Sequence, residues 1–225
     1  MDSSFNLLYA ADASVLSDEN LFAAAYARAS EERKQKTDRY RFCKDQCLSL
    51  GAELLLRKAL GELGVSALVF SYGKEGKPYL AGKSGLYFSL SHSGDHVLCA
   101  VSDHEIGADI ETVRDMDLHV AERFFCRSEY EHIAAQESEN AKQTLFYRYW
   151  TLKESFVKAT GRGLYLPFDR FEIILKDEIS VIQNADSRCF FFREYGEIEC
   201  SRCAVCSVDA PFTGELSVIR LRDCL

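Results

Sequence analysis

Residues 85–111 read GLYFSLSHSGDHVLCAVSDHEIGADIE, and this stretch decides the fold. Two largely apolar runs, 86–90 and 97–101, flank a Ser-Gly-Asp turn, a pattern that is typical of a β-hairpin. A third short run at 106–111 follows a polar break at Asp103 and His104. The stretch therefore predicts a three-stranded unit that ends with two acidic residues, Asp109 and Glu111.

The segments before this unit are predicted to be mainly helical. An alanine-rich run lies at 21–26, and Leu50, Leu54 and Leu55 form an apolar stripe at helical spacing. Residues 65–72 read as a strand, and Pro78 excludes a helix from the glycine-rich turn that follows.

The segments after the unit repeat the mixture of helix and strand. Ser128, with Glu131 three residues on, predicts a helix start with a capping box. A longer helix should run from about residue 140 to Thr160, where Gly161 ends it. Several antiparallel strands are expected beyond Phe168. Each half thus offers helices and a small sheet, which predicts a mixed α/β protein with lobes at 1–105 and 106–225.

Composition limits the class of protein. The chain has 225 residues, 47% of them hydrophobic, and a formal net charge of −8, which argues against a general nucleic-acid binder. No apolar run is long enough to span a membrane, and the first ten residues, MDSSFNLLYA, lack the pattern of a secretory signal. We therefore expect a cytoplasmic protein whose nine cysteines are mostly reduced thiols.

Positive charge is nevertheless concentrated in two segments. Residues 28–44 carry seven basic and three acidic side chains, and residues 148–176 carry six and three. Two basic segments in an acidic protein indicate an anionic ligand between them, although solvated helix faces would give the same pattern.

Three cysteines, Cys200, Cys203 and Cys206, recur at every third position, as in some metal sites. The surrounding segment is short and apolar, which favours a strand. On a strand Cys203 would point to the face opposite Cys200 and Cys206, and no fourth cysteine stands at a matching spacing. A structural strand is therefore favoured over a metal site.

Asp109 and Glu111 are two residues apart on a predicted strand, so their carboxylates point to one face, with Cα atoms roughly 7 Å apart. Two such acids repel each other unless a cation lies between them, and oxygen ligands suit Mg²⁺. The alternative is an exposed strand face.

Trp150, Glu154 and Lys158 are spaced by four residues on the long helix and share a face. The helix is apolar over most of its surface, so its charges need partners. A third carboxylate for a cation at Asp109 and Glu111, with a lysine for a phosphate, would satisfy that need. The alternative is an ordinary helical ion pair.

Other candidate residues could contact an anion. Ser91 and His92 are adjacent on an extended chain and point in opposite directions, so they do not form a nucleophile–base pair. They better fit a polar ledge that donates to phosphate oxygens, and a turn histidine facing water is the alternative. Arg33 and Lys36 share a helix face and could hold a phosphate, and Lys77 could lie at the edge of a nucleotide.

Four segments in this order, SHSG (91–94), IGADIE (106–111), FFCRSEY (124–130) and WTLKESFVKATGRGL (150–164), resemble the 4′-phosphopantetheinyl transferases. More narrowly, the chain is similar to the larger, two-lobed type named for the surfactin-synthetase activator. The resemblance runs from about Ser30 to Pro167, and the combination of motifs is highly specific.

The resemblance implies an α/β (α+β) fold of two pseudo-symmetric lobes, each a small, mainly antiparallel sheet packed with helices. It implies a Mg²⁺-dependent holo-[acyl-carrier-protein] synthase that moves 4′-phosphopantetheine from coenzyme A to a serine of an apo acyl or peptidyl carrier protein and releases adenosine 3′,5′-bisphosphate. Fatty acid, polyketide and nonribosomal peptide synthesis all use such carriers. A monomer is expected, without a nucleic-acid or membrane partner.

The matched motifs also imply roles for single residues. Asp109, Glu111 and Glu154 are expected to hold Mg²⁺, and Glu154, Lys158 and His92 to act in catalysis. Either Glu154 or a metal-bound water would take the proton of the carrier serine. The residues expected to bind coenzyme A are Arg33 and Lys36 (3′-phosphate), Lys77 (adenine), Ser91 and His92 (phosphates), and Lys153 and Lys158 (the transferred phosphate).

Two positions depart from the family pattern, Ser89 where asparagine is frequent and Leu48 where arginine is frequent. Carrier domains are commonly acidic, so the basic segment with Arg148, Arg162 and Arg170 is expected to dock them. Two other functions are alternatives: a non-catalytic relative that binds carriers or coenzyme A, and a Mg²⁺-dependent phosphohydrolase. The first should have lost acidic residues that are present here, and the second needs a means of positioning water that the sequence does not reveal.

Overall fold

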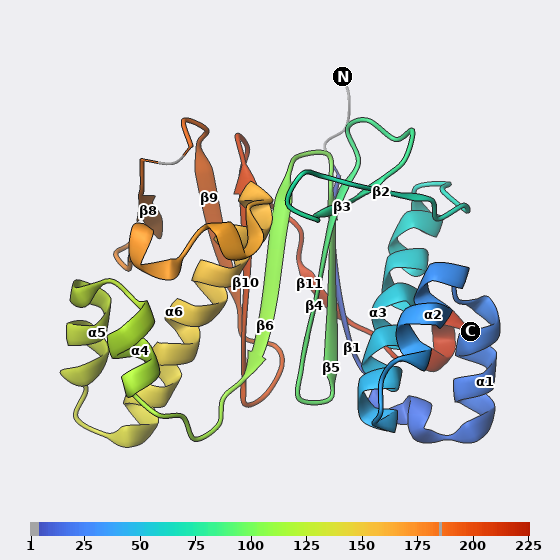
Figure 1. Cartoon of the computed structure of the whole chain (residues 1–225), viewed down its shortest axis with the longest axis horizontal. Coiled ribbons are helices and arrows are strands. Elements are labelled where there is room, and N and C mark those ends of the chain that lie inside the picture. Colours follow the sequence, from blue (N-terminus) through green and yellow to red (C-terminus); the bar gives the residue numbers. More distant parts are fainter. Residues whose placement is uncertain (1–4, 185) are drawn as a thin grey trace.

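The computed structural model describes residues 5–184 and 186–225, which form two sheets with helices packed on their outer faces (Figure 1). The α-helices of this part are α1 (Glu19–Arg28), α2 (Glu31–Asp38), α3 (Cys43–Glu62), α4 (His119–Phe124), α5 (Arg127–Ala134) and α6 (Glu139–Thr160). Its strands are β1 (Asn6–Asp12), β2 (Phe70–Tyr72), β3 (Pro78–Leu80), β4 (Tyr87–Ser93), β5 (His96–Ser102), β6 (Ile106–Thr112), β7 (Glu172–Ile174), β8 (Ser180–Ile182), β9 (Phe190–Tyr195), β10 (Ser201–Val208) and β11 (Leu216–Val218).

The two larger sheets have the strand orders β11-β1-β5-β4 and β6-β10-β9. The predicted hairpin is confirmed as β4 and β5, which pair antiparallel around Gly94, and the predicted third strand is β6. Every pairing is antiparallel except that of β11, which runs parallel to β1. The mixed α/β class with small antiparallel sheets is therefore confirmed, and the C-terminal strand returns to the first sheet.

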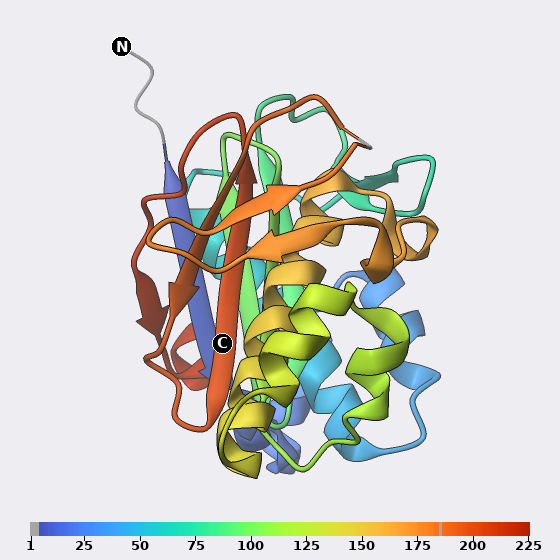
Figure 2. The ribbon, with the colours of Figure 1, turned by 90° about the vertical axis from the view of Figure 1, so that its left-hand side faces the viewer.

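Three apolar clusters hold these layers together. Helix α3 buries its leucine stripe against one face of the first sheet, and α6 covers one face of the second. The opposite faces of the two sheets pack on each other through residues such as Leu8, Leu98, Ile110 and Val205. The short helices α4 and α5 pack outside α6 (Figure 2). This arrangement leaves the two long helices on either side of the neighbouring strands β4 and β6.

Two glycines allow close packing beside the site. A Cβ atom on Gly107 of β6 would lie 2.0 Å from the carbonyl oxygen of Ser155 and 2.4 Å from the nitrogen of Ala159, both on α6. Helix α6 therefore approaches β6 more closely than any residue with a side chain would allow. Gly161 has φ = 70°, which ends α6 with the left-handed conformation that its position predicts.

Some local predictions were wrong. Helix α5 begins at Arg127, so its capping acid is Glu129, whose carboxylate accepts a hydrogen bond from the nitrogen of Cys126; Ser128 and Glu131 do not form the predicted capping box. The predicted strand at 65–72 is reduced to β2, because Val65 and Leu68 pack instead against the core under α3.

The cysteine segment is a strand, as predicted. Cys203 faces the core between the sheets and Cys206 faces the core under α6, whereas Cys200 lies before β10 and is exposed. All nine cysteines are free thiols.

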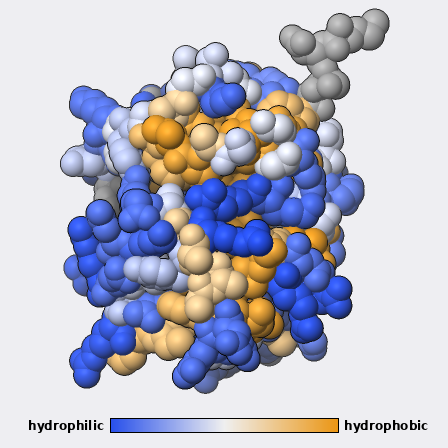
Figure 3. All heavy atoms as spheres, turned by 90° about the vertical axis from the view of Figure 1, so that its right-hand side faces the viewer, coloured by the Kyte–Doolittle hydropathy of each residue, from blue (hydrophilic) through white to orange (hydrophobic). Residues whose placement is uncertain are grey.

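The face shown in Figure 3 is hydrophilic over much of its area, and hydrophobic residues gather in its upper part and in smaller patches in its centre and lower part. Among the described residues, no helix combines the length and the apolar character that crossing a membrane would need.

Candidate active site

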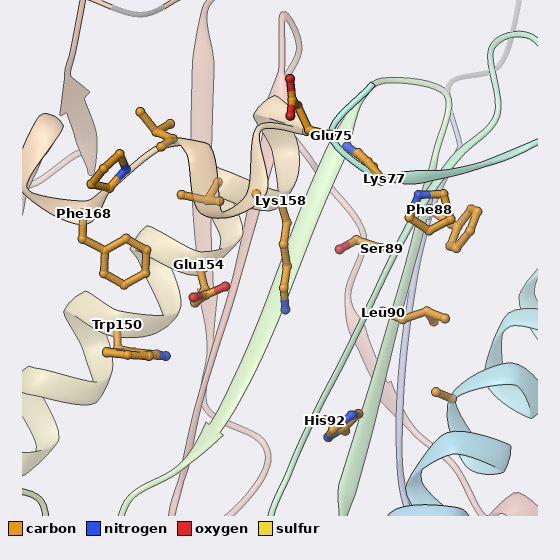
Figure 4. Close-up of a pocket in the computed structure, with 18 of the residues that line it drawn as sticks. Glu75, Lys77, Phe88, Ser89, Leu90, His92, Trp150, Glu154, Lys158 and Phe168 are labelled. Carbon is orange, nitrogen blue, oxygen red and sulfur yellow. The ribbon is translucent and has the colours of Figure 1, made fainter. Parts of the chain in front are cut away.

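A cavity of 980 Å³ opens between α2 and α3 on one side and α6 on the other, beside β4 (Figure 4). Its volume is in the range of pockets that hold a nucleotide-sized ligand. The predicted site residues that line it are Arg33, Lys36, Lys77, His92, Glu154 and Lys158. These residues come from segments far apart in the chain, and the fold brings them to one place.

Asp109 on β6 lies behind the wall of this cavity and is 3% exposed. Its Oδ1 accepts hydrogen bonds from Ser91 Oγ at 2.6 Å and Lys158 Nζ at 2.7 Å. Its Oδ2 is buried and has no hydrogen-bond partner among the described residues. A buried carboxylate oxygen without a partner is costly, so this atom is a good position for a cation.

Lys158 reaches from α6 toward β4 (Figure 4). Besides Asp109, its ammonium contacts Ser91 Oγ at 2.9 Å and the carbonyl oxygen of Ala108 at 3.2 Å. The side chain is 27% exposed, so one part of it meets the cavity and its charge is held against the acidic residues.

The other two predicted metal ligands lie near Asp109. Glu111 accepts a hydrogen bond from Ser93 Oγ at 2.6 Å. The Glu154 side chain forms no hydrogen bond or ion pair with any residue that the structure describes, although burial and nearby charges shift its pKa. Burial is the main cause that raises the pKa of both glutamates above the usual range, and the charge of Asp109 raises the pKa further. The charge of Asp109 therefore disfavours the ionisation of both glutamates, because like charges that lie close together repel each other.

These carboxylates do not yet form a ligand cluster. No group of three histidine, cysteine or acidic side chains in the described part of the chain is arranged to hold a metal ion. The donor set still fits a hard divalent cation, because it offers carboxylate oxygens, an unpartnered Oδ2 on Asp109 and an unpaired Glu154.

The opposite wall is basic. Arg33 on α2 is held by the buried Glu53, whose Oε2 accepts from its Nε at 3.3 Å, and its Nη1 lies 3.5 Å from Ser49 Oγ. The Lys36 side chain forms no hydrogen bond or ion pair with the residues that the structure describes, and it lines the cavity. Burial lowers the pKa of Lys36, and the charge of Arg33 lowers it further. This wall therefore offers positive charge that lacks a full set of partners.

Lys77 and His92 complete the polar lining. Lys77 Nζ donates to the carbonyl oxygens of Ile106 at 3.1 Å and Ala159 at 3.2 Å, and burial lowers its pKa to about 8. His92 lies on β4, and partial removal of water from its ring lowers the pKa, with Lys158 and Lys36 lowering it further. The imidazole is thus favoured in its neutral form.

Lys153 is not brought to the cavity, which corrects its predicted role. Its side chain is fully buried, with Nζ 2.8 Å from Glu129 Oε2 and bonded to the carbonyl oxygens of Phe168 and Phe171. Successive residues on a helix point about 100° apart, so Lys153 cannot share the face of Glu154.

Comparison with known proteins shows the family of the chain. Residues 105–206 match the family described as the 4′-phosphopantetheinyl transferase superfamily, and residues 17–104 match the description 4′-phosphopantetheinyl transferase, N-terminal. The 4′-phosphopantetheinyl transferase gsp of Aneurinibacillus migulanus is 33% identical over 210 residues, which cover 91% of this chain and 86% of that protein. The chain belongs to the 4′-phosphopantetheinyl transferase family.

Another member of the family, the 4′-phosphopantetheinyl transferase Sfp of Bacillus subtilis (strain 168), is 30% identical over 202 residues, 87% of this chain and 89% of that protein. The resemblance found in the sequence motifs is therefore confirmed. Among solved structures, the holo-[acyl-carrier-protein] synthase of Thermotoga maritima aligns with 47% of this chain and 62% of its own, at a TM-score of 0.40 and 19% identity.

The two departures from the family pattern lie in different places. Leu48 is buried in the core under α3 and does not line the cavity, whereas Ser89 contacts β6. Arg148, expected at a docking surface with Arg162 and Arg170, is paired with Glu194 at 2.7 Å and lines a separate hollow.

The sequence did not identify the apolar part of the lining. Trp150 and Phe168 stack edge to face with ring centroids 5.3 Å apart, and both face the cavity (Figure 4). The further lining residues that were missed include Tyr40, Ser49, Arg123 and Phe124. The spacing of Trp150 from Glu154 placed it on the correct face, but no local signal identified the lining residues that α3, α4 and the segment around Tyr40 contribute.

Proposed function

We propose that this protein transfers the 4′-phosphopantetheine group of coenzyme A to a serine hydroxyl of an apo acyl or peptidyl carrier protein and releases adenosine 3′,5′-bisphosphate. The observation that carries the proposal is one cavity with an acidic wall and a basic wall. Glu154, with Asp109 behind it, lies opposite Arg33 and Lys36. Coenzyme A carries a diphosphate and a separate 3′-phosphate, and these two anionic groups match the two walls.

The acidic wall would hold Mg²⁺ through Asp109, Glu111 and Glu154. The support is the unpartnered Oδ2 of Asp109 and the mutual repulsion of the carboxylates, both of which a cation would relieve. When bound, the cation would neutralise charge on the diphosphate and stabilise the leaving phosphate.

The remaining polar residues would bind and orient coenzyme A. Arg33 and Lys36 would contact the 3′-phosphate, and Lys77 would lie near the adenine. His92 would donate to a phosphate. Ser91 already donates its single hydroxyl hydrogen to Asp109, so it would reach a phosphate only by rotating that hydroxyl.

In the transfer step the carrier serine oxygen bonds to the phosphorus that bears the pantetheine arm, and the bond from that phosphorus to the bridging oxygen breaks. The serine proton would pass to Glu154 directly or through a water. Glu154 suits this role, because its side chain lies in the cavity without a hydrogen-bond or ion-pair partner among the described residues, and its pKa is raised by burial and by Asp109. Lys158 would stabilise negative charge on the transferred phosphate.

The proposal also covers the compartment, the oligomeric state and the division of the chain into lobes. We propose a cytoplasmic monomer of two lobes that divide at residues 105 and 106, immediately before β6. The division is supported by the separate cores under α3 and α6. The free state of all nine cysteines agrees with a reducing compartment.

Intact-mass measurement on a panel of apo-carriers tests the proposal. The purified protein, coenzyme A and Mg²⁺ should add one phosphopantetheine group to at least one fatty acid, polyketide or nonribosomal peptide carrier. Relative rates across the panel would identify the pathway. A panel that gains no mass under these conditions would refute the proposed activity.

Two glutamate variants of α6 make the test specific. Glu154→Gln should abolish the gain in mass. Glu139→Gln, on the first turn of the same helix and in an exposed pair with Lys142, should leave it unchanged. Full transfer by Glu154→Gln would remove Glu154 from the mechanism.

A further inference from the structure

Three serines at alternate positions of β4 face β6 across the boundary between the two sheets. Strand β4 is the edge of one sheet and β6 is the edge of the other, and the two are not paired through their backbones. Unpaired edge groups need partners when they are buried. Serine hydroxyls supply those partners here.

The outer two serines bind the backbone of β6. Ser89 Oγ accepts from the nitrogen of Ala108 at 2.9 Å and lies 3.5 Å from the carbonyl oxygen of the same residue. Ser93 Oγ accepts from the nitrogen of Thr112 at 3.1 Å. Since both strands advance together from one contact to the next, β4 and β6 run parallel along this boundary.

Two of the serines also bind the acidic residues. Ser91 Oγ donates to Asp109 Oδ1 at 2.6 Å, and Ser93 Oγ donates to Glu111 Oε2 at 2.6 Å. A hydroxyl has one hydrogen to donate, and in each case a carboxylate receives it. The chain closes tightly just beyond this point, where a Cβ atom on Gly94 would lie 2.4 Å from Thr112 Oγ1.

We propose that Ser89, Ser91 and Ser93 form a hydroxyl ladder that joins the two sheets, and that Ser93 is a positioning residue for Glu111. The second part rests on the proposed function, because it gives Glu111 the task of holding a cation. Ser93 fixes one oxygen of Glu111 against the backbone of β6, and the other oxygen is left for the cation.

The same geometry explains why a hydroxyl is suitable at these positions. Its donated hydrogen bond favours the ionised carboxylate that a cation requires, and it brings no charge that would compete with the cation. The oxygen of the Ser93 hydroxyl also accepts a hydrogen bond from the backbone nitrogen of Thr112 on β6. The Glu111 carboxylate is therefore held in a fixed position relative to this strand. Hydrogen bonds of this kind to metal ligands typically change cation affinity about 10–100-fold.

The test measures Mn²⁺ affinity in the presence of coenzyme A by electron paramagnetic resonance, together with amide hydrogen exchange of the metal-free protein. Ser93→Ala should weaken Mn²⁺ binding about 10–100-fold and speed exchange at Thr112. Ser93→Thr, which keeps the hydroxyl, should leave the Mn²⁺ affinity and the exchange rate at Thr112 close to those of the parent. Ser89→Ala should speed exchange at Ala108 with much less effect on Mn²⁺, because Ser89 contacts no carboxylate.

Ser102→Ala is the matched control. Ser102 is also a buried strand serine. Its Oγ accepts a hydrogen bond from the nitrogen of His104 and lies 2.9 Å from Asn6 Oδ1 and 3.4 Å from Asp103 Oδ1. It lies at the opposite end of the β4–β5 hairpin from Ser93, away from Asp109 and Glu111. Ser102→Ala should change neither the Mn²⁺ affinity nor the amide exchange rates at Ala108 and Thr112. If Ser93→Ala binds Mn²⁺ as the parent does, the positioning role is overturned while the proposed function stands. If the parent itself binds no Mn²⁺, the cation site of the proposed function fails as well.

Discussion

Helix α6 carries one lysine on each of two faces, and each lysine contacts a carboxylate from another element: Lys153 contacts Glu129 of α5, and Lys158 contacts Asp109 of β6. The two faces differ in how fully their charged groups are paired. On the outer face Lys153 is fully buried, yet its ammonium meets Glu129 Oε2 and two carbonyl oxygens. Glu129 in turn accepts from the nitrogens of Cys126 and Ile173. Every charge on this face has its partners within the protein.

The cavity face is left incomplete. Glu154 has no partner among the described residues, and Asp109, next to Lys158, keeps a buried oxygen without a hydrogen bond. The comparison separates a structural ion pair from a site built for a ligand. The first satisfies its charges internally, and the second stores unfavourable contacts that a ligand would relieve.

The largest expected effect comes from breaking the outer pair. Lys153→Met would leave Glu129 buried without its counter-charge, which should lower the free energy of unfolding by about 3–5 kcal/mol. Urea denaturation followed by circular dichroism measures this loss. The double variant Lys153→Met with Glu129→Gln should recover part of it, since no unpaired charge then remains.

An exposed pair on the same helix gives the control. Lys142 pairs with Glu139, whose side chain is largely exposed, so Lys142→Met should cost no more than about 1 kcal/mol. Equal urea midpoints for Lys142→Met and Lys153→Met would show that the buried pair carries no special share of the stability.

Local sequence signals predicted the elements that frame the site. The turn at Gly94 fixed the β4–β5 hairpin, and Gly161 fixed the end of α6, because the conformation at each position depends on the residue itself. Helical spacing likewise placed Glu154 and Lys158 on one face. The motifs were sufficient to identify the family.

Contacts between distant segments decided what the sequence did not show. Glu129 rather than Glu131 caps α5 because its carboxylate also meets Lys153, a residue 24 positions later. The motif that contains Lys153 and Glu154 predicts both residues at the site, although the place of Lys153 beside Glu154 turns its side chain to another face of the helix. The ladder of serines needs the juxtaposition of β4 and β6, which a single strand cannot reveal.

The same substitution on the cavity face should affect catalysis more than stability. Lys158→Met removes the ammonium group that contacts Asp109 and faces the cavity, so kcat with an accepted carrier should fall about 10²–10³-fold. Stability should fall less than in Lys153→Met, because the Lys158 side chain is partly exposed, whereas Lys153 is fully buried. Steady-state kinetics and urea denaturation of both variants measure the contrast. A near-parental kcat would reduce Lys158 to a structural role.

The smallest effect tests whether the cavity face is strained without its ligand. The pKa of Glu154 is raised above 4.5 by burial and then by Asp109 and Glu111, so the folded protein binds this proton more tightly than the unfolded chain. Stability due to Glu154 is therefore lost as pH rises from about 4.5 through the raised pKa. Glutamine has no proton to lose at this position.

In excess chelator, Glu154→Gln should thus be more stable than the parent by about 1 kcal/mol near pH 7, with little difference near pH 4. Adding Mg²⁺ with coenzyme A should stabilise the parent and not the variant, which would reverse the order. Thermal unfolding at the two pH values measures both changes. If the variant is no more stable than the parent at either pH, the unpaired carboxylate carries no strain, and the contrast between the two faces of α6 is limited to Lys153.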